Sequence, residues 1–261
     1  MKQFLITAIT SIVLFSSCKK DDTPEYNSNI KAPLSIEFDN VAGSSDLELD
    51  GGYKTANGDS IYITKLKYYV SNFKLTRTDG TVYTVPQEDS YFLVDESDEA
   101  THEAELEIPE GEYKTLSFTL GVDSLRSTMD ISQRTGVLDP AGAGADMYWT
   151  WNSGYIFFKL EGTSPQSMMG DVMYHIGGFG GYSSSTINNI KTITLDLSTR
   201  GVPKVKSGKQ TNVHLFVDAL KMFTGATNVS IAANPMVMFD PFSISIANNY
   251  TTMFKHDHTE N

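Results

Sequence analysis

Apolar and polar residues alternate with period two over much of the chain after residue 33, which is the pattern of half-buried β-strands. Between residues 103 and 108, three glutamates alternate with Ala, Leu and Ile. In the next run Leu116, Phe118 and Leu120 share one face. Turn signals such as Asp79-Gly80 separate these runs at short intervals. The pattern predicts an all-β fold, an antiparallel β-sandwich of Greek-key or barrel-like type with a few short helices.

The same pattern predicts the individual elements and the core. We expect strands over residues 34–38, 61–76 (two joined pieces), 82–85, 91–95, 104–108, 113–122, 155–160, 172–176, 190–197 and 211–217. Helical segments are expected over residues 123–138, 219–223 and 242–254. The predicted core consists of Leu116, Phe118, Leu120, Phe158, Leu160, Ile193, Leu195, Leu215 and Val217.

The stretch from Met147 to Gly162 contains both tryptophans of the protein. In an extended chain Trp149 and Trp151 project to the same side. The turn residues after Trp151 lead into an apolar run from Tyr155 to Leu160, as expected for a strand buried on both faces. Spacing alone favours a packing role for both indoles, since large aromatic side chains are mostly buried.

The first 17 residues have the features of a signal peptide, which are a basic Lys2 and an apolar run from Phe4 to Phe15. This run is too short for a permanent membrane span. Ser16-Ser17-Cys18 resembles a bacterial lipoprotein cleavage site, and Cys18 is the only cysteine of the chain. The alternative is an ordinary signal peptide with an unrelated thiol. We expect residues 1–17 to be a lipoprotein signal peptide, Cys18 to carry acyl chains such as palmitate, residues 18–32 to be a flexible tether, and 33–261 to be one domain.

The net charge of the chain argues against one class of binding partner. A formal net charge of −12 argues against nucleic-acid binding, because phosphate contacts need a basic face.

The charged Lys19-Lys20-Asp21-Asp22 resembles the segment that sends some lipoproteins to the outer face of the outer membrane. We therefore expect an outer-membrane, lipid-anchored protein of the cell envelope, on the periplasmic or the cell-surface side.

Several motifs together resemble one known family. They are Met147-Tyr148-Trp149-Thr150-Trp151-Asn152-Ser153-Gly154-Tyr155, Glu161-Gly162, His175-Ile176-Gly177, the strand Tyr68 to Leu75, and Gly111-Glu112-Tyr113 with Phe118 and Leu120-Gly121-Val122. This combination is similar to the signature of the MbnP-like copper-binding family, whose members occur beside methanobactin genes and, more widely, as lipoproteins. The resemblance runs from about Leu34 to the C-terminus.

The resemblance implies copper as the bound metal. In some members a tryptophan of the double-tryptophan segment is oxidised to kynurenine by a partner di-haem peroxidase, beside the copper site. Trp149 and Trp151 are the two candidates in this chain, and spacing does not choose between them.

Histidines are the expected copper ligands, because imidazole nitrogen suits copper well. His175 lies in the family-like His-Ile-Gly segment and is the first candidate. His258 and His256 are two residues apart in the tail, so both could chelate one ion if the tail is extended. His214 comes after them. For each of these residues the alternative is a structural histidine or a solvated C-terminus.

Two classes of function are compatible with the sequence. The first is a copper-binding envelope lipoprotein for metal acquisition or handling. The second is an accessory β-sandwich lipoprotein that binds a glycan or a protein partner without metal. The chain lacks a nucleophile elbow, a phosphate loop, a dinucleotide fingerprint and a zinc-protease motif, so we do not expect an enzyme.

Overall fold

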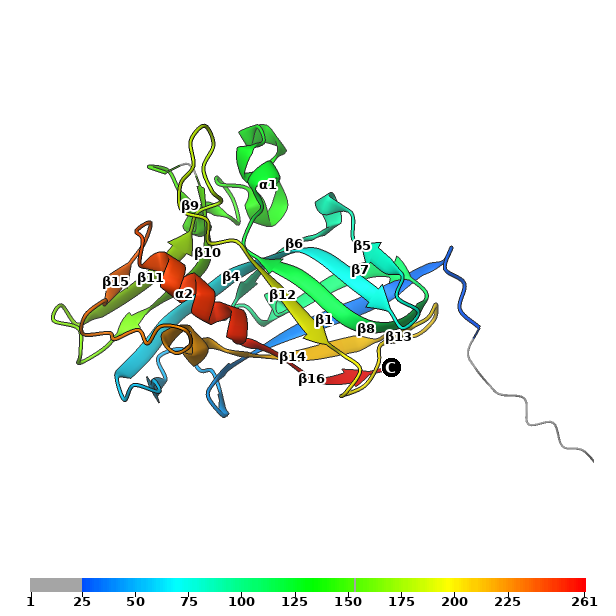
Figure 1. The fold of residues 1–261 in the computed structure, drawn as a ribbon, viewed down its shortest axis with the longest axis horizontal. Helices are drawn as coiled ribbons and strands as arrows, with labels where there is room; N and C mark the ends of the chain where they lie inside the picture. The colour runs from blue at the N-terminus through cyan, green and yellow to red at the C-terminus, as the bar shows by residue number, and fades with distance from the viewer. Residues whose placement is uncertain (1–24, 153) are drawn as a thin grey trace, which may run out of the picture.

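The structure is a computed structural model that describes residues 25–152 and 154–261. Its strands form two sheets that pack face to face, with α2 beside them and a group of loops and short helices, including α1, above one end (Figure 1). The all-β sandwich is thus confirmed. The predicted signal peptide, Cys18 and residues 19–24 of the predicted tether lie outside the described residues, and β1 already begins at Lys31.

The smaller sheet has, among the described residues, five strands in the order β16-β14-β1-β2, and β7 pairs with the N-terminal part of β1 on the edge that β2 also uses. Its strands are β1 (Lys31–Ala42), β2 (Ser45–Asp46), β7 (Glu103–Pro109), β14 (Asn212–Asp218) and β16 (Phe254–Glu260). β1 and β14 run parallel, although they come from opposite ends of the chain. The antiparallel prediction did not include this pair, because local patterning does not reveal which distant strands become neighbours.

The larger sheet has, within the described part of the chain, the order β12-β8-β4-β10-β11-β15, and shorter strands pair with further stretches of β4, β8 and β10. Its strands are β3 (Gly52–Lys54), β4 (Ser60–Arg77), β5 (Val82–Thr84), β6 (Tyr91–Asp95), β8 (Gly111–Leu120), β9 (Tyr148–Trp149), β10 (Gly154–Thr163), β11 (Asp171–Gly177), β12 (Lys191–Asp196), β13 (Lys204–Val205) and β15 (Met236–Val237).

β4 is the longest strand of the larger sheet and joins the two extended pieces that the sequence predicts. The pieces meet at Asn72, which has a φ of 54°, and the register against β8 shifts between Ser71 and Lys74. Asparagine tolerates this left-handed conformation better than most residues do. Its side-chain amide also donates to Asp123, so the bulge is held in place.

The helices are short and lie at the ends of the sheets. They are α1 (Ser124–Thr128), α2 (Ser243–Asn249) and the 3-10 helices η1 (Gln87–Asp89), η2 (Glu99–Thr101), η3 (Ile131–Gln133), η4 (Gly136–Leu138), η5 (Ala145–Met147), η6 (Ala219–Phe223) and η7 (Tyr250–Thr252). The predicted segment 219–223 is η6, whereas the segments 123–138 and 242–254 contain helix in shorter pieces. Among the described residues there is no helix long and apolar enough to cross a membrane.

The core between the sheets is aromatic at its centre. The ring of Phe118 contacts Phe38, Phe73 and Phe254, at centroid distances of 5.8, 5.6 and 5.1 Å. All nine predicted core residues lie in this core or pack against it, and Leu195 alone is only partly buried. Phe254 begins β16, so its burial draws the C-terminal tail onto the smaller sheet.

Candidate metal centre

Two histidines from the predicted set meet on the outer face of the smaller sheet. His214 on β14 pairs with His258 on β16, while the next pair in the ladder is Leu215 with His256. Asp257 is therefore the extra residue of a β-bulge, and bulges redirect side chains and recur beside functional sites. The bulge brings Asp257 and His258 to the same side of β16, next to His214.

The three side chains converge on one carboxylate oxygen. Oδ2 of Asp257 lies 2.7 Å from His258 Nδ1 and 3.5 Å from His214 Nδ1. The two imidazole rings are 4.8 Å apart, centroid to centroid. One ligand atom from each residue falls within 4.8 Å of the other two. The hydrogen bond between Asp257 and His258 raises the pKa of His258 and lowers that of Asp257.

Two further carboxylates face the far side of the His214 ring. Nε2 of His214 lies 3.5 Å from Asp39 and 3.7 Å from Glu37, both on the neighbouring β1. These negative groups favour the proton on Nε2, which leaves Nδ1 with a free lone pair. Nδ1 is buried and has no hydrogen-bond partner. A metal ion would satisfy this atom, and the residues present therefore fit a metal.

The donor set is two imidazole nitrogens and one carboxylate oxygen. Such a set suits copper and other borderline divalent ions, and copper is favoured among first-row metals by the general order of affinities. The carboxylates of Asp39 and Glu37 would orient the His214 ring, as carboxylates hydrogen-bonded to the far nitrogen of a metal-bound histidine usually do. The side chain of His258 is 46% exposed, so the centre is open to solvent.

The remaining histidines lie apart from this centre. His256 points to the opposite side of β16, where Nε2 lies 3.0 Å from the Thr259 hydroxyl, and burial lowers its pKa. The sequence prediction that His256 and His258 share a face fails because the bulge at Asp257 shifts the alternation. His102 follows η2, and its Nε2 lies 3.2 Å from the Asp95 carbonyl oxygen.

His175 lies on β11 in the larger sheet, and its neighbours are ions of both signs. Its Nε2 is 2.8 Å from Glu161, which also lies 3.5 Å from Lys65 and 3.9 Å from Lys159. Desolvation lowers the pKa of His175, and the hydrogen bond to Glu161 opposes this only in part. The nearby ammonium groups would repel a metal cation. These surroundings therefore fit a structural histidine better than a metal ligand.

Asp146 completes the ion network around His175. It contacts Lys159 at 2.7 Å, Lys65 at 3.4 Å and Lys67 at 3.5 Å. Burial alone would raise the pKa of Asp146, but the hydrogen bond and the charges of these lysines outweigh it and lower the pKa to about 2.

The sandwich core separates His175 from the tail. Tyr174 and Ile176 point into the core from β11, and Leu215 does so from β14. His175 and His214 alternate with these residues, so they lie on opposite outer faces of the sandwich. The structure thus does not bring His175 and the tail histidines together, because they belong to different sheets.

The tryptophan pair lies on the His175 side. Trp149 is buried, whereas Trp151 is 64% exposed and rests against it at a centroid distance of 5.3 Å. Phe239 packs against both indoles. Trp149 also contacts Gly177, the last residue of the His-Ile-Gly segment. The two motifs of the sequence therefore meet in space, but away from His214.

Sequence reasoning missed three carboxylates of the centre, Asp257, Asp39 and Glu37. The His-Asp-His motif at residues 256–258 was a signal in the sequence that Asp257 could be a ligand. Asp39 and Glu37 alternate with core residues along β1, but their place beside His214 depends on the parallel pairing.

Comparisons with known proteins identify the family. The MbnP family model matches residues 31–239, which is most of the chain. The chain belongs to the MbnP family. Among solved structures it is similar to MbnP from Methylosinus trichosporium, with 17% sequence identity and a TM-score of 0.55 over 83% of this chain and 87% of that chain. At this identity the likeness shows the fold. No curated protein matches the sequence.

The family match ends before the tail. Asp257 and His258 lie beyond residue 239, whereas His214 lies within the matched range. The convergence of the three residues therefore rests on the geometry of this MbnP-family chain itself.

Proposed function

We propose that this MbnP-family protein binds one copper ion at His214, Asp257 and His258 and serves copper acquisition or handling in the cell envelope. The observation that carries the proposal is the convergence of two imidazoles and a carboxylate on one exposed sheet face. The unpartnered Nδ1 of His214 and the family membership support it. The ion would be the cargo of the protein, and we propose no enzymatic activity.

The ligand set also favours one oxidation state of the copper ion. Cu(I) prefers soft sulfur ligands, and the three converging residues offer nitrogen and oxygen instead. We therefore propose that the bound form is Cu(II). Zinc accepts the same donors, so selectivity against zinc rests on the higher affinity of copper.

The direct test is a copper titration of the purified protein, followed by electron paramagnetic resonance. Wild type should bind one equivalent of Cu(II), with nitrogen hyperfine structure from imidazole. His214→Ala and His258→Ala should each lose at least about tenfold in affinity, because one nitrogen ligand is gone. His102→Ala is the matched control, since its ring lies outside the cluster.

Two results would contradict the proposal. One is equal copper uptake by wild type, His214→Ala and His258→Ala. The other is a loss of copper in His175→Ala with full retention in His214→Ala, which would place the metal beside the tryptophan pair. If the protein bound zinc and copper with equal affinity, the proposed role in copper handling would be contradicted, but the metal site would stand.

Envelope anchoring through Cys18 remains part of the proposal, with the outer membrane as the site. The di-haem peroxidase partner that the family resemblance implies also stays a proposal. Trp151 is the more accessible of the two candidate indoles for such a partner, because Trp149 is only 5% exposed.

A further inference from the structure

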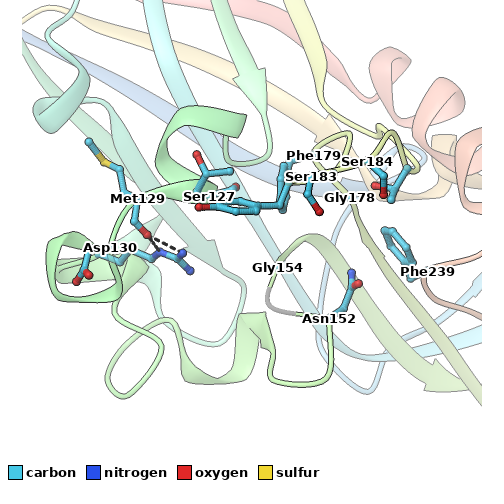
Figure 2. Close-up of a pocket in the computed structure, with 15 residues that line it drawn as sticks. Ser127, Met129, Asp130, Asn152, Gly154, Gly178, Phe179, Ser183, Ser184 and Phe239 are labelled. Carbon is cyan, nitrogen blue, oxygen red and sulfur yellow. Dashed lines mark hydrogen bonds between the residues drawn. The ribbon is translucent and has the colours of Figure 1, made fainter.

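Phe239, whose ring packs against the exposed indole of Trp151, lines an open cleft of about 590 Å³. It forms between α1 and the segment after it, the start of β10, the loop of residues 178–186 and Phe239. Figure 2 shows Phe179, Phe239 and Asn152 around this cleft, each from a different segment. In Figure 1, α1 and β9 lie far from β16, so the cleft is separate from the metal centre. Its volume is in the range of small-molecule sites.

The lining of the cleft is polar but nearly uncharged. Serine and threonine hydroxyls come from both sides, at Ser127, Thr128, Ser183, Ser184 and Thr186, and Asn152 adds an amide. The hydroxyls of Ser127 and Thr128 donate to backbone carbonyls of their own segment, so the exposed Ser183, Ser184 and Thr186 are the main partners for a ligand. Hydroxyls and amides both donate and accept hydrogen bonds, so they match ligands that carry many hydroxyl groups.

The two charged residues of the lining, Arg134 and Asp130, form hydrogen bonds with other groups of the protein. Arg134 donates to the Met129 carbonyl through two nitrogens (Figure 2). A third nitrogen donates to the Tyr148 hydroxyl. Asp130 accepts hydrogen bonds from the backbone and the hydroxyl of Ser132. These partners are neutral, but the two residues carry opposite charges, so the lining has no net charge that would select an ionic ligand.

Aromatic rings supply the apolar part of the site. Phe179 and Phe239 line the cleft, and Tyr182 lines it with 79% of its surface exposed. Trp151 extends this surface, because its ring lies 6.4 Å from that of Phe239. Exposed rings beside hydroxyl groups match the alternating C–H faces and hydroxyl edges of a pyranose.

We propose that this cleft binds a short neutral oligosaccharide. The sugar faces stack on Tyr182, Phe179 and Trp151, and the hydroxyl edges bond to the serines and Asn152. This site is independent of the copper centre and gives the protein a second binding function, away from β16.

The test uses the two tryptophans of the chain as a probe. Purified full-length protein, freed of metal by a chelator, is titrated with maltoheptaose, cellohexaose, xylohexaose and mannohexaose while tryptophan fluorescence is followed. An oligogalacturonate serves as the anionic comparison. We expect saturable binding of at least one neutral oligosaccharide and no comparable binding of the anionic one.

Variants then locate the site. Tyr182→Ala should weaken binding about tenfold, since it removes an exposed ring without a folding role. Phe179→Ala should weaken binding similarly. Tyr62→Ala removes an exposed tyrosine on β4 and should bind like wild type, and so should His214→Ala, which separates this test from the copper proposal. Absence of binding by all four neutral sugars, wild-type binding by Tyr182→Ala, or equal binding of the oligogalacturonate would each overturn the proposal.

Discussion

The indole of Trp149 lies directly on the backbone of Gly177. A Cβ atom at Gly177 would lie 2.8 Å from the indole and 2.3 Å from the carbonyl oxygen of Tyr155. Both distances are shorter than carbon contacts allow, so the glycine of the His-Ile-Gly segment is required by the packing of the tryptophan segment.

Gly177→Ala should therefore destabilise the protein by about 1–3 kcal/mol, the usual effect of overpacking. Urea denaturation would measure the change. Gly154→Ala is a matched control on the neighbouring strand, because the nearest atoms to its added Cβ are 3.8 Å away. Equal stability of the two variants would show that Trp149 does not pack on Gly177.

Asp39→Asn should weaken copper binding about 10- to 100-fold, the usual effect of removing a partner that orients a histidine ligand. Asp39 faces Nε2 of His214 and is not itself one of the three converging ligands. Glu107→Gln removes one charge from the same sheet and is the control for simple electrostatic attraction. An equal loss in both variants would indicate that Asp39 acts through charge alone.

His175 should make stability depend on pH. Burial lowers its pKa in the folded protein below the ordinary value of 6.5, so the unfolded chain binds the proton more readily. The contribution of His175 is therefore present above pH 6.5 and is lost as the pH falls through this value toward the folded pKa.

Urea midpoints of wild type and His175→Gln at about pH 8 and about pH 5 would measure this effect. The advantage of wild type over the variant should shrink, or reverse, at the lower pH. A difference that stays constant with pH would show that His175 titrates equally in the folded and unfolded chains.

Phe254→Ala should destabilise the protein by about 3–5 kcal/mol, because it removes a buried ring that contacts Phe38, Tyr68 and Phe118. Lys255→Ala, at the next and exposed position, should have little effect. If the two variants unfold at the same urea concentration, the tail is not held as β16, and the metal centre would lose its His258.

Cys18→Ser should release the protein from the membrane fraction or leave its precursor uncleaved, because the acyl chains that we propose would have no attachment atom. Fractionation and mass spectrometry of the mature N-terminus would report this. Ser28→Ala, in the polar segment that follows, should keep wild-type processing. Membrane retention and normal cleavage of Cys18→Ser would contradict the lipoprotein assignment.

The fold class, most strands and the core of this protein follow from local patterns in the sequence. Period-two alternation places Phe118 and Leu215 inside because each strand has only two faces, and the apolar face must be buried. Turn residues such as Asp79-Gly80 likewise act locally, so the strand boundaries near them could be predicted.

The tertiary structure alone decided which histidines share a site. His175 and His214 have similar local patterns, but β11 and β14 belong to different sheets, so the core lies between them. His214 meets His258 because the buried ring of Phe254 holds the tail as an edge strand, and the bulge at Asp257 turns two ligands to one face. Both effects depend on contacts between distant segments, and local alternation carries no information about them.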